Sequence, residues 1–369
     1  WEIRGGTWLE QDGNLVNGES WAHQFLHAQH WLDDNFGQRA KTGINIDAFG
    51  FNYNMPQLYR NAEIDAFVTQ KLRYNDTNVY PHLIFWWEGP DNTRILTVFA
   101  HPDHYQQMLP WDLAKNQREF HMNTGFKTLM TFFGIGDHGG GPGESMFRRI
   151  ERCRRLPIFP QIELGGIEDY LAYLRDQDLS QLPVWKDDLY LENHRKSYST
   201  KACIKKANRD GEELLTNAEK FSTLANLTSP NDRREELAEL WRLLLFNQFH
   251  DILPGTSIPS VFADALEDYA KLQKRGKRIL DDSLRLLTGG TQQPTADAER
   301  TLVVFNPLSW TRTGYVKVTL PDNTSNWRVL SADNKEVEVQ PVSGEEEDEP
   351  QLAFQAEDVP ALGYATYTL

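Results

Sequence analysis

The stretch GINIDAFGF at residues 43–51 decides the fold class, because it couples a buried strand to a polar residue at its end. Its apolar positions alternate and are largely β-branched, which favours a strand, and residues 55–62 have the spacing of a helix. Asp47 therefore falls at the C-terminal end of a strand, where α/β barrels carry catalytic groups. An aspartate at this place can also cap the following helix, and this stretch alone leaves both interpretations open.

Residues 1–182 continue the same alternation of short apolar runs and helical patterns, which is typical of parallel strands joined by crossover helices. Two of the runs, 83–87 and 95–100, are separated by Gly-Pro-Asp-Asn and predict a hairpin inserted in this domain. The remaining strands are expected at 2–10, 43–49, 66–70, 127–133 and 158–163. Helices are expected at 18–35, 55–61, 113–125, 142–155 and 167–175.

Residues 183–290 have a different character, with three long helical patterns separated by short turns. The patterns cover 201–227, 233–250 and 259–287, and they predict a three-helix bundle. Beyond the linker GGTQQP, residues 298–369 contain short runs separated by turns, as in the start of a β-sandwich. The acidic run at 345–349 fits a solvated loop, with cation binding as the less favoured alternative.

The run NQFHDILPGTS at 247–257 carries the strongest functional signal. The second long helix is expected to bring His250 and Asp251 side by side at its end, where Pro254 and Gly255 stop it. An imidazole beside a carboxylate is half of a metal or sugar site. Taken alone, the pair is explained more simply as a hydrogen-bonded histidine and a local cap.

A glycine-rich run, FGIGDHGGGP at 133–142, follows the strand expected at 127–133. Its glycines bring the backbone close to a ligand and expose Asp137. Such a loop before a helix can also hold phosphate. It lacks the Lys-Ser/Thr pair, does not match Gly-x-Gly-x-x-Gly in frame, and its acidic residue disfavours an anion.

The composition narrows the class of protein. A net charge of −15 argues against binding to nucleic acid and to anionic membranes. Cys153 and Cys203 have no metal spacing and are interpreted as reduced thiols of a cytoplasmic protein. No run of 18 apolar residues and no signal peptide is visible.

The three motifs, in this order, resemble the α-mannosidases of glycoside hydrolase family 38, of the bacterial and cytosolic type. Further agreement comes from WEIRGGTW at 1–8, Glu19-Ser20, Thr69-Gln70-Lys71 and LYLENHR at 189–195. The resemblance covers nearly the whole chain. It implies an α/β, then α, then β organisation: an incomplete seven-stranded (β/α) barrel, a three-helix bundle and the start of a β-sandwich.

The resemblance also implies roles for individual residues. Asp47 matches the nucleophile, which is also a zinc ligand, His250 matches a second zinc ligand, and Asp137 matches the general acid/base. Residues expected to contact the sugar are Phe49, Lys71, His194, Arg195, Tyr198 and Asp251. The reaction implied is retaining hydrolysis of a terminal α-mannoside, in which Asp47 forms a glycosyl-enzyme ester.

One departure from the family pattern concerns the metal. The family takes two more zinc ligands from a His-x-Asp run that should precede Trp1, and His101-Pro102-Asp103 lies in the wrong context. We therefore expect one Zn²⁺ with two of its four ligands in this chain. The chain is interpreted as an internal piece that needs the remainder of the enzyme and is inactive alone.

Two other functions remain open from the sequence. The chain could be a non-catalytic carbohydrate-binding piece, or a metal-dependent deacetylase-like hydrolase on a similar barrel. The expected partners are an α-mannoside or mannose-containing oligosaccharide and the rest of the same enzyme, with self-association into a homo-oligomer left open.

Overall fold

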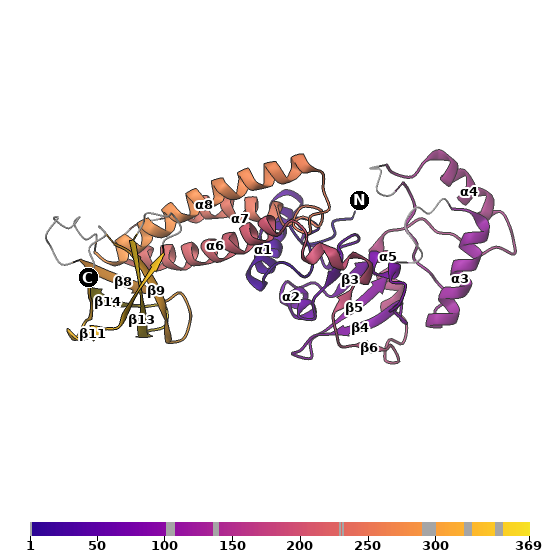
Figure 1. The fold of residues 1–369 in the computed structure, drawn as a ribbon. Coiled ribbons are helices and arrows are strands. Elements are labelled where there is room, and N and C mark those ends of the chain that lie inside the picture. Colours follow the sequence, from indigo (N-terminus) through magenta and orange to yellow (C-terminus); the bar gives the residue numbers. More distant parts are fainter. Residues whose placement is uncertain are drawn as a thin grey trace. The chain divides into compact units, whose positions relative to one another are not determined.

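The computed structural model describes residues 2–100, 108–135, 140–228, 230, 232–289, 300–320, 327–343 and 350–369 (Figure 1). The chain forms two units. The first contains Trp1–Thr216 and Arg234–Gly276, and the second contains Asn217–Arg233 and Lys277–Leu369. No helix among the described residues has an apolar stretch long enough to cross a membrane.

The first unit is built on a five-stranded sheet with the order β1-β3-β5-β4-β6. Its strands are β1 (Thr42–Ile44), β3 (Ala66–Thr69), β4 (Ile84–Glu88), β5 (Arg94–Phe99) and β6 (Val184–Trp185). The pairs β1–β3, β3–β5 and β4–β6 are parallel, whereas β4–β5 is antiparallel. Every residue of β3 is buried, as expected for a strand covered on both faces.

The predicted hairpin is confirmed, but its place in the fold differs from the prediction. Strands β4 and β5 are joined by a tight turn in which Gly89 donates to the carbonyl of Thr93. Instead of forming an insertion, β5 pairs directly with β3 in the middle of the sheet. The sequence of β5 after Arg94 is apolar with one threonine and fully buried, which suits a central strand and not an exposed insertion.

Three predicted strands, at 2–10, 127–133 and 158–163, are wrong, because these segments are irregular apart from isolated bridges. Apolar side chains from the last two are used differently. Phe133, Phe159 and Ile162 pack against a small core that contains Leu113 and Ile150. An apolar run indicates that a segment is buried. Here the segments are buried by packing against helices and not by pairing in a sheet.

The helices of the first unit agree closely with the predictions. They are α1 (Gly18–Phe36), α2 (Met55–Asn61), α3 (Pro110–Thr124), α4 (Glu144–Arg154) and α5 (Ile167–Arg175). The boundaries of α1 have clear causes. The side chain of Asn17 accepts a hydrogen bond from the Ser20 amide, and Gly37 ends the helix in the left-handed conformation.

Three further helices follow: α6 (Ala202–Thr228), α7 (Arg234–Phe246) and α8 (Pro259–Leu287) (Figure 1). In the first unit they approach closely at Gly211 of α6. A Cβ atom placed there would lie 3.1 Å from Leu244 of α7 and 3.4 Å from Leu272 of α8. The missing side chain therefore allows close contact with both neighbouring helices.

The predicted extension of the second helix to His250 is wrong, because α7 ends at Phe246. The backbone of the next residues leaves the helix to bond with the N-terminal segment. Gln248 accepts from the Asp12 amide at 3.0 Å, and the His250 amide donates to the carbonyl of Glu10 at 3.2 Å. His250 is consequently fixed by this segment and not by a helical turn.

The second unit contains two antiparallel sheets. One has the order β11-β10-β14-β8 and the other β12-β13-β9. The strands are β8 (Thr301–Phe305), β9 (Arg312–Thr319), β10 (Val329–Ser331), β11 (Glu336–Val337), β12 (Val339–Ser343), β13 (Pro350–Val359) and β14 (Tyr364–Thr368). Val329 and Tyr367 from the first sheet share a buried core with Phe354 and Val359 from the second. The strands of both sheets lie between Thr301 and Thr368, and the acidic run at 345–349 lies outside the described residues.

Candidate active site

The loop that carries Asp47 begins where β1 ends and is held at its other end by a second strand pair. There, β2 (Gly50–Phe51) pairs with β7 (Leu189–Tyr190). Gly50 has a φ of 127°, and a Cβ atom at this position would lie 2.9 Å from the carbonyl oxygen of Leu189. Only glycine fits such a conformation at so close an approach. The loop is therefore anchored on both sides of Asp47.

Lys71 reaches Asp47 because the neighbouring parallel strand ends at the same edge of the sheet. It begins the 3-10 helix η1 (Lys71–Tyr74), shortly after β3. Its Nζ lies 2.7 Å from Oδ1 of Asp47 and 4.8 Å from the ring centre of Phe49. The lysine thus neutralises the carboxylate from one side and contacts the aromatic ring beside it.

His250 faces the other oxygen of the same carboxylate. Its Nδ1 lies 2.8 Å from the carbonyl oxygen of Glu10, so Nδ1 carries a proton, because a carbonyl can only accept. Its Nε2 then lies 3.5 Å from Oδ2 of Asp47 and 4.0 Å from Oδ2 of Asp251. The imidazole presents its second nitrogen to two carboxylates.

The charged side chains around Asp47 stabilise one another and shift one another's pKa. Burial would raise the pKa of Asp47, but hydrogen bonds and positive charge from His250 and Lys71 lower it below its usual value. Burial would lower the pKa of His250, whereas Asp47, Glu10 and Asp251 together raise it. Asp47 therefore remains a carboxylate at neutral pH, which is the form a nucleophile needs.

Two aromatic rings form a wall beside the carboxylate. Phe49 stacks on His194 with ring centres 4.7 Å apart and planes inclined by 14°, and it meets His250 edge-on at 6.1 Å. Burial and the nearby Lys71 lower the pKa of His194, so this ring is neutral. Phe49 is itself buried, with His194 stacked on its ring and Lys71 close to it, so the two rings form an apolar support beside the charged group.

Of the nine residues predicted for the site, six lie in this cluster: Asp47, Phe49, Lys71, His194, His250 and Asp251. The remaining three do not, or are not described. Arg195 is exposed and donates to the carbonyl of Glu192 within the 3-10 helix η2 (Glu192–Tyr198). The hydroxyl of Tyr198 accepts a hydrogen bond from Asn14, and its ring stacks on Tyr190. Asp137 lies outside the described residues.

Glu10 belongs to the site and was missed by the sequence analysis. Its Oε1 accepts a hydrogen bond from the Asp47 amide at 2.5 Å, and its carbonyl oxygen holds His250. Burial raises the pKa of its carboxyl group against the lowering effect of the Asp47 amide. The available signal was an acidic residue in WLEQDGN at 8–14, in a segment otherwise expected to be a strand.

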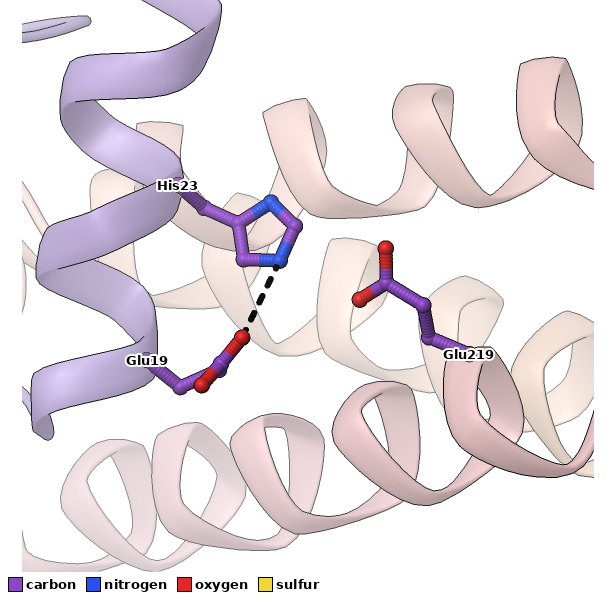
Figure 2. Close-up of side chains that lie close together, drawn as sticks. All are labelled: Glu19, His23 and Glu219. Carbon is purple, nitrogen blue, oxygen red and sulfur yellow. Dashed lines mark ion pairs between the residues drawn. The ribbon is translucent and has the colours of Figure 1, made fainter. Parts of the chain in front are cut away.

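A second acid–imidazole pair, on α1, is separate from this cluster. Oε1 of Glu19 lies 3.7 Å from Nε2 of His23, one helical turn further on (Figure 2). The His23 ring stacks on Trp241 of α7 with centres 3.7 Å apart. This contact explains the pair as packing between α1 and α7. Glu219, also drawn in Figure 2, belongs to the second unit.

The donor atoms at Asp47 and His250 suit a metal ion of the zinc type. Zinc binds nitrogen and oxygen ligands at about 2.0–2.2 Å, so two tetrahedral ligands lie about 3.4 Å apart. The 3.5 Å between Nε2 of His250 and Oδ2 of Asp47 matches this spacing. Within the described ranges, no third His, Cys, Asp or Glu joins these two with all ligand atoms within 4.8 Å of one another. The two side chains would therefore supply only part of the coordination shell of a zinc ion.

Comparison with known families shows that this chain belongs to glycosyl hydrolase family 38. Residues 1–188 match the model "Glycosyl hydrolases family 38 N-terminal domain", and residues 192–287 match "Alpha mannosidase middle domain". The family expected from the sequence motifs is confirmed.

Individual relatives are α-mannosidases. The chain is 34% identical to alpha-mannosidase 2C1 of Mus musculus over 325 residues, which cover 86% of this chain and 30% of the mouse protein. It is 31% identical to the alpha-mannosidase of Saccharomyces cerevisiae, covering 84% of this chain and 29% of the yeast protein. The chain thus spans about a third of the length of these relatives.

The fold resembles a solved structure of the same kind. The crystal structure of an alpha-mannosidase from Enterococcus faecalis V583 matches with a TM-score of 0.75 at 17% identity, covering 99% of this chain and 47% of that one. At this identity the likeness concerns the fold alone. The chain therefore has the mixed α/β fold, with several sheets, of a family 38 protein.

Proposed function

We propose that the Asp47 cluster is the nucleophile side of a retaining α-mannosidase site. The observation that carries this proposal is the carboxylate of Asp47 held between Lys71 and His250, with Oδ1 2.7 Å from Nζ and Oδ2 3.5 Å from Nε2. Both neighbours favour the anion and hold it still. A fixed, unprotonated carboxylate beside an aromatic wall is suited to attack a sugar carbon.

The proposed reaction has two steps. An Asp47 oxygen bonds to the anomeric carbon while the glycosidic carbon–oxygen bond breaks, and the leaving oxygen takes a proton from an acid. Water then attacks the anomeric carbon of the resulting ester, the bond from that carbon to the Asp47 oxygen breaks, and a proton of the water passes to the same acid/base group, which releases Asp47 as a carboxylate. We assign the acid/base role to Asp137, on the family resemblance of its glycine-rich loop. Phe49 and His194 would line the sugar, and Asp251 would bind its hydroxyl groups.

We further propose that Asp47 and His250 contribute to a zinc site. The two donor side chains, the protonated Nδ1 of His250 and the 3.5 Å donor spacing support this assignment. When bound, zinc would act as a Lewis acid that orients sugar hydroxyl groups, without generating a metal hydroxide. The number of ligands supplied from outside this chain remains a prediction from the family pattern.

The proposed domain organisation follows the family. Residues 1–182 would be part of a seven-stranded (β/α) barrel that includes the five-stranded sheet, 183–290 a three-helix bundle, and 298–369 the beginning of a β-sandwich. The match of 192–287 to the α-mannosidase middle domain supports the second assignment. A cytoplasmic location stays a prediction that the two free cysteines favour. The need for the remainder of the enzyme is a prediction that fits the partial coverage of the relatives. Self-association is a prediction from the family resemblance alone.

Trapping of the nucleophile tests this function. A fluorinated mannosyl donor, applied to an enzyme that contains residues 1–369, should label Asp47 in a peptide map, and Asp47→Asn should abolish the label. Asp33→Asn is a matched control, because Asp33 pairs with Arg39 outside the site. Labelling of another carboxylate contradicts the assignment.

The stereochemistry separates the remaining alternatives. Cleavage of an α-mannoside with retained anomeric configuration supports the proposal, whereas release of acetate from an acetylated sugar indicates the deacetylase-like function. Binding of mannosides without any turnover or label favours a non-catalytic carbohydrate-binding piece.

A further inference from the structure

One residue, Glu10, contacts both halves of the Asp47–His250 pair. Its side-chain oxygen Oε1 accepts the Asp47 amide at 2.5 Å. Its main-chain carbonyl accepts both the backbone amide of His250 at 3.2 Å and Nδ1 of the same residue at 2.8 Å. The two groups that face each other across 3.5 Å are therefore bound to the same residue.

The segment around Glu10 is fixed against both of its neighbours. The Asp12 amide donates to the carbonyl of Gln248, and Nδ2 of Asn45 donates to the carbonyl of Gln11. Gln11 also forms an isolated bridge with Phe249. The contacts with Gln248 and Phe249 join the backbone of the segment to the His250 turn, and the bond from Asn45 joins it to the loop that carries Asp47. On the side of Asp47, the carboxylate of Glu10 is the contact that reaches the amide of the candidate nucleophile.

The neighbouring acid shows by contrast what Glu10 does. Asp12 is fully buried, but its Oδ1 accepts from the amides of Asn14 and Leu15, in its own turn. Its bonds are local, whereas those of Glu10 join segments 37 and 240 residues away. An acceptor placed between two separate segments sets the distance between them.

We propose that Glu10 is a positioning residue: its carboxylate holds the Asp47 loop, and its carbonyl holds His250 with the proton on Nδ1, so that Oδ2 and Nε2 converge. The catalytic consequence rests on the function proposed above, whereas the geometry is independent of it. An acceptor one bond away from a ligand fixes both the orientation and the tautomer of that ligand.

Hydrogen exchange of the 369-residue chain, followed by mass spectrometry, tests the side-chain contact. In Glu10→Ala, the Asp47 amide loses its acceptor, so its exchange should become about tenfold faster. Glu10→Gln keeps an acceptor oxygen and should restore the wild-type rate to within about threefold. Unchanged exchange in the alanine variant, or failure of glutamine to restore it, overturns the proposal.

Glu192 provides a matched control. It is also a buried glutamate whose carboxylate holds a loop, accepting the amides of Thr77 at 2.5 Å and Asn78 at 3.1 Å. Glu192→Ala should accelerate exchange at Thr77 and Asn78 and leave Asp47 unchanged. Equal acceleration at Asp47 in this variant shows general loosening, and the specific role of Glu10 is then rejected.

Two further measurements address His250 and the metal. At about pH 9, ¹⁵N imidazole spectra, assigned with His250→Asn, should show the Nδ1–H tautomer in the wild type and in both Glu10 variants, because the backbone carbonyl remains. The Nε2–H tautomer contradicts the proposal. Zn²⁺ affinity, measured with a competing chelator, should fall about 10–100-fold in Glu10→Ala and recover in Glu10→Gln.

These readouts separate the two proposals. When exchange, tautomer and glutamine rescue are all as expected but a longer enzyme that contains residues 1–369 cleaves no mannoside, the proposed function is rejected and the positioning role is kept. If the wild-type chain takes up no Zn²⁺, the exchange and tautomer measurements decide alone.

Discussion

Replacement of Lys71 by methionine should remove a pH-dependent part of the stability of the first unit. The Lys71–Asp47 bond is a charge-assisted hydrogen bond, which contributes about 1.5–3 kcal/mol. The Asp47 side chain is 37% exposed, so water screens the pair, and we take the lower end, about 1.5 kcal/mol. A domain of this size shifts its Tm by about 2–4 °C per kcal/mol, so the expected coupling is about 4 °C.

The sign of the pH dependence follows from Asp47, whose pKa is lowered in the folded state. The stabilisation is present above the unfolded pKa of about 3.9 and is lost as the pH falls through the lower folded value. The coupling should therefore be the same at about pH 7 and pH 5 and decrease toward pH 3. Any other effect of removing the lysine on the free energy of unfolding should not follow the protonation of Asp47, so the decrease toward pH 3 is specific to this pair.

The assay is a double-mutant cycle of wild type, Lys71→Met, Asp47→Asn and the double variant, by thermal unfolding with a chelator present. The exposed pair Lys41–Glu63, 3.0 Å apart, is the control and should show no measurable coupling. Absence of coupling at pH 7, or a coupling that persists unchanged once Asp47 is protonated, refutes the reasoning.

Three other outcomes are expected. His250→Asn should destabilise the metal-free chain more at about pH 5.5 than at pH 9. The pKa of His250 is raised in the folded state, so its protonation stabilises the fold below the unfolded pKa of about 6.5, and this contribution is lost as the pH rises through the folded value. Thermal unfolding at both pH values checks this, and the opposite trend contradicts it. Gly211→Val should lower the free energy of unfolding by about 1–3 kcal/mol, because the added side chain would press against Leu244 and Leu272. At Gly18, an added Cβ would have no atom within 4 Å, so Gly18→Val should change the free energy of unfolding by no more than about 0.5 kcal/mol. Denaturant titrations measure both values. Phe354 is 1% exposed, and Phe354→Ala should lower the stability of the second unit by about 3–5 kcal/mol, measured by hydrogen exchange of the amides in β9 and β14. Tyr315 on β9 is 83% exposed, and Tyr315→Ala should leave this exchange nearly unchanged.

Helices were predictable where the cause is local. The helix at 167–175 and the helix at 259–287 have the boundaries expected from their periodicity and flanking residues. Strand prediction failed at 127–133, because an apolar run does not distinguish a strand from a segment packed against helices.

The candidate site was predictable only in part. The motifs around Asp47 and His250 indicated which side chains to expect, and the structure brings these two together with Lys71. The only sequence signal for Glu10 was an acidic residue in a segment expected to be a strand. Its contacts could not be predicted, because they reach residues 37 and 240 positions away. The end of α7 was also predicted wrongly because of long-range contacts. After Phe246, the backbone of residues 248 and 250 forms hydrogen bonds with residues 12 and 10 in place of further helical bonds.

The anchoring of the Asp47 loop between β1 and the β2–β7 pair has a consequence for substrate choice. The backbone on either side of Asp47 is held in place, and glycine is required at Gly50. Under the function proposed above, Asp47 then has little freedom to follow sugars of differing shape. For the proposed enzyme, discrimination between linkages would then depend on residues outside 45–51, and efforts to broaden the range of accepted glycosides should leave residues 45–51 unchanged.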